Sequence, residues 1–401
     1  MNLSLLLSKS SVGWPRVRLG DLAEHRLGKM LDKQKNTGLP RKYLRNPNIR
    51  WFDIDLSDLQ EILVEEKDLQ RYDLRDGDVL ICEGGEAGRA AIWKGDSQGI
   101  IFQKACHRVR VGPNLDARFL VHRLMFDYFN GGLEDYYTGA TIKHFTGQDL
   151  ARYEIQLPPL DEQKRIAAIL DKADHLRQKR RQAIALLDSL THSIFLEMFG
   201  DPVSNPKGWR LGQIGDLLDG ANYGTSAKAG ANGKLPILRM GNVTSDGRID
   251  VTDLKYIDLT DKERDKYTVR RGDLLFNRTN SADLVGKTAV FDRDGEFAFA
   301  GYLVRARTNH AATPEFVSAY LNSCHGKRVL RGMAKSIVGM ANINAKEMQR
   351  IAISIPPVDL QIRFSEKLDQ LKQTRQKFQP LIEMADSLFF SLQHRAFSGQ
   401  L

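Results

Sequence analysis

The sequence contains few of the groups that commonly carry out catalysis. It has 401 residues but only three cysteines, Cys82, Cys106 and Cys324, and no C-x-x-C spacing, which excludes a disulfide framework and a cysteine-based zinc site. None of the nine histidines forms an H-x-x-x-H or H-E-x-x-H pair, and no G-x-x-x-x-G-K-[ST] phosphate loop occurs. Asn46 and Asn205 each precede a single proline, whereas an amino-methyltransferase would carry Asn/Asp-Pro-Pro-aromatic. We therefore predict a non-catalytic chain that binds no metal and no cofactor.

Long apolar runs are also absent. The only apolar run near the start, residues 3–7, is short and has no basic region before it, and no stretch approaches the roughly 18 apolar residues of a membrane-spanning helix. We expect a cytoplasmic protein with no membrane partner. Basic residues are in excess, with a formal net charge of +9 and a pI of about 9.3. This excess is compatible with a polyanionic partner.

The two halves of the chain match each other block by block in the same order. Residues 43–49 resemble 237–243, residues 54–59 resemble 249–254, and residues 72–80 resemble 267–275. Residues 88–93 resemble 286–291, and residues 155–163 resemble 353–361. Two copies are too few for a solenoid. The sequence therefore predicts an internal duplication of one domain of about 150 residues together with an accessory element.

The accessory element that follows each double proline is predicted to be a long helix. Asp161 and Asp359 are expected to cap these helices. Apolar residues then recur at steps of three and four, most regularly from Phe364 to Ala396, which is the seam of a coiled coil. Each helix is the natural partner of the other. Pro380 lies inside the second pattern and is expected to kink or split that helix.

The remainder of each half mixes short β-rich runs with turns and one short helix, predicted at 117–129 in the first half and 314–322 in the second. This mixture predicts an α+β fold. The fold has two similar mixed α/β domains, separated by a long antiparallel two-helix coiled coil and related by an approximate two-fold axis. The predicted boundaries are 1–158 for the first domain, 159–200 for the first helix, 201–356 for the second domain and 357–401 for the second helix.

Polar and basic residues of the two domains form candidate nucleic-acid contacts. Arginine pairs with guanine edges and asparagine with adenine edges, while lysines suit phosphates. The copies differ most at 83–86 and 277–280, the place where two domains that read different sequences would differ. The candidate DNA-binding residues are Lys29, Arg41, Lys42, Arg45, Arg50, Glu83, Glu86, Arg89, Lys143, His144, Arg239, Asn242, Asn277, Arg278, Thr279, Asn280, Lys287, Lys335 and Asn342.

With these motifs in their duplicated order, the sequence resembles specificity subunits of Type I restriction–modification systems. The resemblance rests on 28–31, 43–45, the glycines at 84, 85 and 88, 157–163, 238–242, 272–280 and 285–288. It implies two target-recognition domains that read a bipartite double-stranded DNA site with a non-specific gap. It also implies two docked adenine methyltransferase subunits, which use S-adenosylmethionine, and restriction subunits that join for cleavage.

Two other functions are compatible with the same residues. A stand-alone sequence-specific DNA-binding protein would bind its target without a methyltransferase. A coiled-coil scaffold would use the helices alone and would retain DNA, if at all, without dependence on Arg45 or Arg278.

Overall fold

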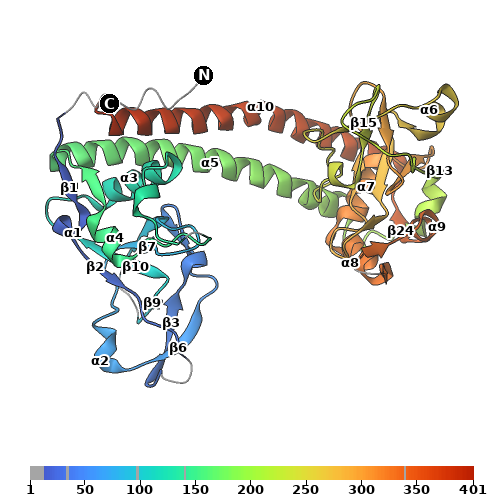
Figure 1. Cartoon of the computed structure of the whole chain (residues 1–401). Helices are drawn as coiled ribbons and strands as arrows, with labels where there is room; N and C mark the ends of the chain where they lie inside the picture. The colour runs from blue at the N-terminus through green and yellow to red at the C-terminus, as the bar shows by residue number, and fades with distance from the viewer. Residues whose placement is uncertain (1–12, 33–35, 96–98, 140, 338–339) are drawn as a thin grey trace. The chain divides into compact units, whose positions relative to one another are not determined.

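The computed structural model describes residues 13–32, 36–95, 99–139, 141–337 and 340–401, with the backbone alone for 335–337. The chain packs into two compact units (Figure 1). Unit 1 comprises residues 1–180 and 381–401, and unit 2 comprises residues 181–380. Each unit therefore takes part of both long helices, α5 (Leu160–Phe199) and α10 (Val358–Phe397).

Unit 1 is built on a four-stranded sheet of order β2-β10-β7-β8. A second sheet places β3 between antiparallel β6 and parallel β9, and β1 pairs with β11. Its strands are β1 (Arg16–Arg18), β2 (Ala23–Leu27), β3 (Leu39–Leu44), β4 (Ile49–Arg50), β5 (Asp53–Ile54), β6 (Gln60–Val64), β7 (Val79–Cys82), β8 (Ala90–Ile92), β9 (Ile101–Phe102), β10 (Cys106–Val111) and β11 (Glu154–Gln156). Its shorter helices are α1 (Leu19–Leu22), α2 (Glu66–Leu69), α3 (Ala117–Phe129) and α4 (Gly147–Arg152), with 3-10 turns η2 (Asn46–Asn48) and η3 (Glu134–Tyr136).

Unit 2 repeats this topology, with the sheet β13-β21-β17-β19, the pair β12-β24, and β14 between antiparallel β15 and parallel β20. Its strands are β12 (Arg210–Gln213), β13 (Leu218–Tyr223), β14 (Leu235–Leu238), β15 (Lys255–Ile257), β16 (Thr268–Val269), β17 (Leu274–Asn277), β18 (Thr279–Asn280), β19 (Thr288–Val290), β20 (Phe297–Phe299), β21 (Leu303–Thr308), β22 (Lys335–Ile337), β23 (Met340–Asn342) and β24 (Ala352–Ile355). Its helices are α6 (Asp261–Tyr267), α7 (Pro314–Asn322), α8 (Cys324–Met333) and α9 (Ala345–Gln349), with turns η4 (Ile214–Leu217) and η5 (Met240–Asn242).

The predicted duplication and α+β fold are thus confirmed, and α3 and α7 have the bounds expected from the sequence. Two equivalent glycines make the same close contact with the backbone in both units. A Cβ on Gly28 would lie 2.3 Å from the Gln103 carbonyl oxygen, and one on Gly224 would lie 2.3 Å from that of Ala300. Only glycine allows this close approach. It brings the end of β2 against the residue after β9, and the end of β13 against the residue after β20.

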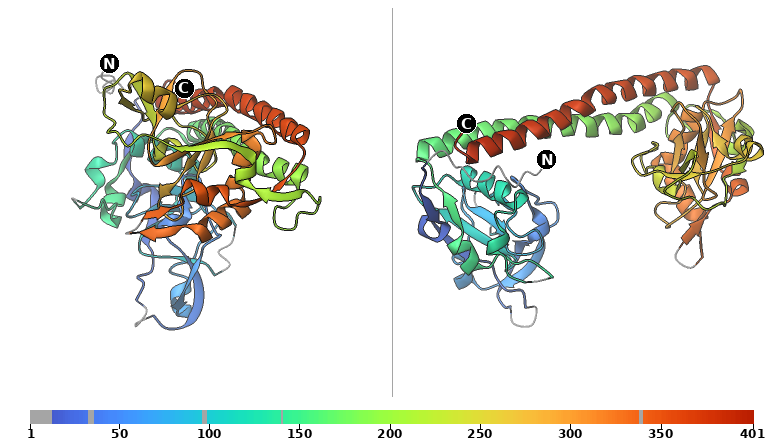
Figure 2. Two further views of the ribbon diagram at one scale, coloured as in Figure 1. Left: turned by 90° about the vertical axis from the view of Figure 1, so that its right-hand side faces the viewer. Right: turned by 45° about the horizontal axis from the view of Figure 1, so that its top comes forward.

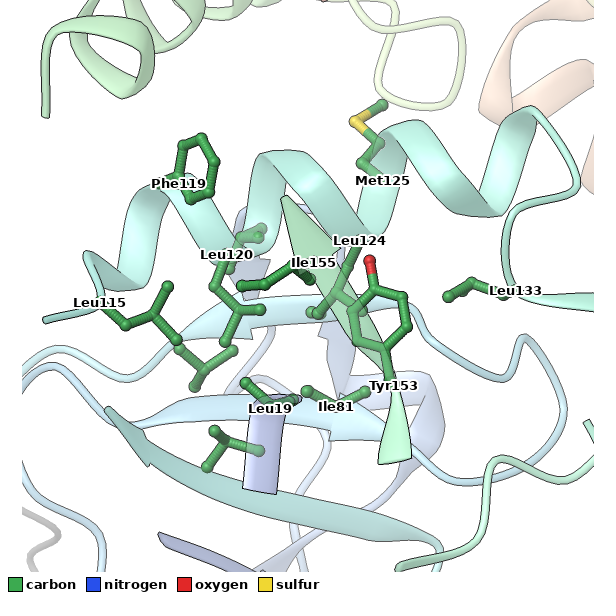
Figure 3. Packing of buried hydrophobic residues seen from close by; sticks show 14 of the residues in the cluster. Leu19, Ile81, Leu115, Phe119, Leu120, Leu124, Met125, Leu133, Tyr153 and Ile155 are labelled. Carbon is green, nitrogen blue, oxygen red and sulfur yellow. The ribbon is translucent and has the colours of Figure 1, made fainter. Parts of the chain in front are cut away.

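The core of unit 1 lies on one face of its sheet and continues into the long helices. Figure 3 shows Leu120 and Leu124 of α3 packed toward the sheet, while Phe119 points away from it. Phe119 contacts Phe397 of α10, with ring centroids 5.6 Å apart. Phe389 of α10 is fully buried in the same core. The end of the chain therefore completes the core of the first domain.

Unit 2 has the matching arrangement. Phe195 and Phe199 of α5 pack against Phe316 of α7 and Phe364 of α10, all buried. Within each unit α5 and α10 lie side by side and antiparallel (Figures 1 and 2). Two equivalent ion pairs join them, Arg177–Asp386 at 3.7 Å in unit 1 and Asp188–Arg375 at 2.5 Å in unit 2.

The starts of the long helices differ from the expectation. Asp161 and Asp359 lie inside the first turn and are not the caps, because α5 begins at Leu160 and α10 at Val358. Carboxylates in the first turn still interact favourably with the positive end of the helix dipole. The anchors are instead two fully buried glutamines, Gln163 and Gln361. Each amide bonds two backbone carbonyls and one backbone N–H, which ties the long helix to the loop before α3 or α7.

The split expected at Pro380 does not occur, because α10 is one continuous helix from Val358 to Phe397. The proline removes only the N–H that would bond the carbonyl of Gln376. Both residues are exposed, so water can satisfy that carbonyl. On the next residue, the carbonyl of Leu381 accepts a hydrogen bond from Arg180 Nη1 at 2.8 Å.

Candidate nucleic-acid interface

Two equivalent loops follow the central strands of the two sheets. In unit 1, Cys82 N–H donates to Arg89 O (2.8 Å) and Gly88 N–H to Cys82 O (2.9 Å). In unit 2, Asn277 N–H donates to Lys287 O (2.8 Å) and Gly286 N–H to Asn277 O (2.8 Å). These bonds make the ends of the loop 83–89 equivalent to the ends of the loop 278–287, which is three residues longer. We call them reading loop 1 and reading loop 2.

The matched bonds correct the alignment made from the sequence by one position. Asn277 is the equivalent of Cys82, and Arg278 is the equivalent of Glu83. Both Glu83 and Arg278 accept at the backbone carbonyl from the segment that closes the loop, from Phe145 N–H at 2.6 Å and from Ile343 N–H at 2.9 Å. His144 and Asn342, one residue earlier, are therefore equivalent as well.

These two equivalent pairs carry opposite chemistry. In unit 1, the Glu83 carboxylate lies 3.2 Å from His144 Nδ1. In unit 2, Arg278 Nη2 donates to Asn342 Oδ1 at 3.4 Å, and the guanidinium lies 4.8 Å from the ring centroid of Tyr223. Asn342 Nδ2 also donates to Thr279 Oγ1 at 2.8 Å. One scaffold thus presents an acceptor in unit 1 and a donor in unit 2.

Tyr223 was not among the residues selected from the sequence. It ends β13, where its equivalent in unit 1 is Leu27, and the residue is 42% exposed. A lone aromatic at the end of a strand gives no sequence signal of its own. The duplication does give one, because a framework position changes from leucine to tyrosine beside a divergent loop.

The turns η2 and η5 place another set of predicted residues beside the reading loops. The Asn242 amide, 4% exposed, accepts from Arg239 N–H and donates to the Asp250 and Asp253 carbonyls. Arg239 Nη2 donates to the Asp253 carboxylate at 2.8 Å. Arg45 makes the same pair with Asp58 at 2.6 Å. These side chains shape the turns, and the amide of Asn242 is fully used by the fold.

Two basic side chains tie the turns to the loops. Arg89 Nη2 donates to Asn46 O at 2.9 Å, and Lys287 Nζ donates to Met240 O at 3.1 Å. Burial lowers the pKa of Lys287 below its ordinary value.

Asn277 is fully buried under the same turn and donates to Met240 O at 3.3 Å, while its Oδ1 finds no partner among the described residues. Glu86 pairs with Arg89 at 2.6 Å.

Other predicted residues lie away from the reading loops or bond within the fold. Lys29 pairs with Asp68 at 2.9 Å, Arg50 with Asp55 at 2.7 Å and Lys143 with Glu134 at 2.6 Å. Lys42 is exposed on β3, and Arg41 lines a polar pocket with Asp73 and Arg75. The Asn280 side chain accepts from Ser281 N–H. The side chain of Lys335 lies outside the described part of the chain.

Among the described residues, no group of histidine, cysteine or acidic side chains could hold a metal ion. Cys82 and Cys106 are buried free thiols, and burial raises the pKa of Cys82 to about 11. No helix in the described ranges is long and apolar enough to cross a membrane.

Comparison with known proteins decides the family. Residues 11–186 and residues 206–380 each match the model of the Type I restriction modification DNA specificity domain. The chain belongs to this family. It is a Type I specificity subunit with two target-recognition domains, as its motifs indicated. The specificity subunit of the EcoKI enzyme of Escherichia coli is 22% identical over 388 residues, which cover 89% of this chain and 82% of that one.

Solved structures share the fold of this specificity subunit. A chain from a study of complex assembly and conformational transition of the type I R-M system matches with a TM-score of 0.58 and 21% identity, covering 98% of this chain and all of that one. The S subunit from M. genitalium matches with a TM-score of 0.57 and 14% identity over 97% of both chains. The predicted coiled coil between two mixed domains agrees with these folds.

Proposed function

We propose that this specificity subunit is the non-catalytic reader of a bipartite double-stranded DNA target, with one half-site read by each unit. The observation that carries the proposal is the exchange of Glu83–His144 for Arg278–Asn342 at equivalent backbone positions. A carboxylate accepts from the amino group of cytosine, whereas an arginine donates to guanine. Identical frameworks with opposite hydrogen-bonding groups are what two readers of different sequences require.

The boundaries predicted from the sequence stay part of this proposal. Residues 1–158 and 201–356 would be the target-recognition domains, and the segments 159–200 and 357–401, which contain α5 and α10, would connect them. Within the candidate set, the narrower group that belongs to the reading loops or contacts them is Glu83, His144, Arg278, Thr279 and Asn342. The remaining candidates would position the loops or contact phosphates.

The reading of unit 2 can be tested by replacing Arg278 with alanine in the chain co-expressed with its methyltransferase subunits. A good arginine–base contact contributes about 1–3 kcal/mol, so methylation at the target should fall by roughly 5- to 150-fold. Long-read mapping of methylated sites should show relaxed preference in one half-site only. Glu83→Ala should relax the other half-site. Arg271→Ala, an exposed arginine paired with Asp294, is the matched control.

Three outcomes would contradict the proposed reading. Retention of both half-sites by Arg278→Ala would remove the loop from the interface. Tight specific binding by the isolated chain would favour a stand-alone DNA-binding protein. Retention of random DNA that is insensitive to substitution of Arg45 and Arg278 would favour a scaffold.

We also propose that two methyltransferase subunits dock on the long helices. Leu186 and Leu190 of α5, in unit 2, are 66% and 40% exposed. Their equivalents on α10, Met384 and Leu388 in unit 1, are 65% and 58% exposed. Exposed apolar residues at equivalent positions suit two copies of one partner. Restriction subunits would then join the complex formed.

A charge placed beside Leu190 on α5, or beside Leu388 on α10, should remove one methyltransferase subunit. Leu186→Glu and Met384→Glu are each expected to leave one methyltransferase subunit bound in place of two, because a buried unpaired carboxylate is costly. The double variant should bind none. Native mass spectrometry counts the subunits, and Leu176→Glu, at an exposed position whose equivalent is Thr374, serves as the control. Two subunits retained by the double variant would place docking elsewhere.

A further inference from the structure

Helix α8 of unit 2 packs directly against reading loop 2. Ser323 caps its start by accepting from Gly326 N–H at 3.0 Å. Leu330, 2% exposed, fills the space beside Gly286, where an added Cβ would lie 2.6 Å from Leu330 Cδ1. The hairpin of β22 and β23 follows α8 at once and pairs with β18 of the loop. Helix, hairpin and reading loop therefore form one packed assembly.

The outward face of α8 is basic. Lys327, Arg328 and Arg331 are all exposed, and their spacing of one and three residues places them on one side of the helix. Among the described residues, Lys327 Nζ donates to the Ser245 carbonyl at 3.1 Å, and Arg331 lies 3.5 Å from a largely exposed Asp283. Exposed ion pairs of this kind contribute about 0–1 kcal/mol and are readily exchanged. These three cations are thus available to an outside anion.

The equivalent place in unit 1 carries two acidic residues beside one lysine, because Glu134 pairs with Lys143 at 2.6 Å. A Cβ on Gly88 would lie 2.6 Å from Leu133 Cδ1, so Leu133 is the structural equivalent of Leu330. The residues that follow it form η3 and include Glu134 and Asp135. Over the whole sequence, unit 2 holds 29 Lys and Arg against 22 Asp and Glu, whereas unit 1 holds 30 against 28. The excess positive charge lies in unit 2.

We propose that the basic face of α8 binds DNA phosphates beside the half-site that reading loop 2 reads. This inference rests on the proposed function, and it assigns three residues that no motif had selected. Phosphate contacts give affinity without sequence information, while base contacts specify. The two domains are therefore unequal: unit 2 supplies most of the salt-sensitive grip, and unit 1 adds sequence discrimination with little electrostatic attraction.

The salt dependence of binding tests this inequality. The triple variant Lys327→Gln, Arg328→Gln, Arg331→Gln is compared with the wild type, each as the full chain purified with its methyltransferase subunits. Fluorescence anisotropy of labelled target DNA is measured from 0.05 to 0.5 M KCl. Each phosphate contact contributes about 0.9 to the slope of log K against log salt, so the slope should fall by about 2 to 3. Affinity at 0.15 M salt should drop on the order of 100-fold.

The matched control removes three charges elsewhere in unit 2. Lys262 and Lys266 lie on α6, at the opposite end of the unit from α8 in Figure 1, and Arg271 follows β16. Their glutamine variants should leave the slope unchanged. The α8 side chains are exposed, so circular dichroism should show an unchanged melting temperature in both triple variants. Methylation mapping at low salt should still find both half-sites.

The possible outcomes separate the two proposals. A wild type with no sequence preference for DNA would overturn the proposed function itself. A wild type that reads DNA, with an α8 variant of unchanged slope or a control of equal loss, would overturn the assignment to α8. Loss of a methyltransferase subunit from the α8 variant would also overturn it and would identify the basic face as a protein contact.

Discussion

Deletion of residues 381–401 is expected to unfold the rest of unit 1, residues 1–180, and to leave unit 2 folded. These residues carry Phe389, Ala396 and Phe397, all buried in the core of unit 1. Loss of a buried phenylalanine costs about 3–5 kcal/mol. Two such losses are comparable with the whole stability of a domain, about 5–15 kcal/mol. Unit 2 keeps its own segments of both helices, 181–199 and 358–380.

Hydrogen exchange measured by mass spectrometry locates the unfolding. In the fragment 1–380, backbone amides of β7 and β10 should lose protection, while those of β17 and β21 should keep it. Protection of β7 at the full-length level would show that the end of the chain is dispensable to unit 1.

Neighbouring point variants give a milder form of this test. Phe389 is fully buried, and the Arg177 guanidinium lies 4.1 Å from its ring centroid. Phe389→Ala should lower the free energy of unfolding of unit 1 by about 3–5 kcal/mol. Phe390, which is 42% exposed, should tolerate alanine at a cost below about 1 kcal/mol.

The fold could be predicted from the sequence because each predicted element occurs twice, once in each half of the chain. The helix at 117–129 is supported by its equivalent at 314–322, and both occur with those bounds. The long helices were evident from their apolar spacing, because steps of three and four that continue over many turns are typical of a coiled-coil helix. Pro380 misled because a proline on an exposed helix face sacrifices one hydrogen bond without ending the helix.

The site was less accessible, because contact loops have no periodicity. Arg45, Arg239 and Asn242 have the chemistry of base readers, but the structure uses them to hold turns. The pairing of Glu83 with Arg278 depended on strand register, which an alignment of short divergent loops placed one residue away. Helix α8 was missed because the equivalent described stretch of the first half forms the short turn η3 instead of a helix.

The second prediction concerns the gap between the half-sites, which we propose is set by the length of the helices. The ion pairs Arg177–Asp386 and Asp188–Arg375 are equivalent, since 177 corresponds to 375 and 188 to 386. Ala185 and Glu383 are equivalent in the same way and lie between these pairs. Four residues inserted near each position add about 6 Å to both helices. One base pair spans about 3.4 Å.

The double insertion is therefore expected to widen the gap by one or two base pairs and to leave both half-sites unchanged. Methylation mapping of cells that carry the variant with its methyltransferase subunits reads the gap directly. Insertion near Ala185 alone is the control: it moves Asp188 by one turn away from Arg375, so methylation should be lost at every spacing. A double insertion that methylates at the original spacing would show that the helices do not set the gap, because each unit would then find its half-site independently of their length.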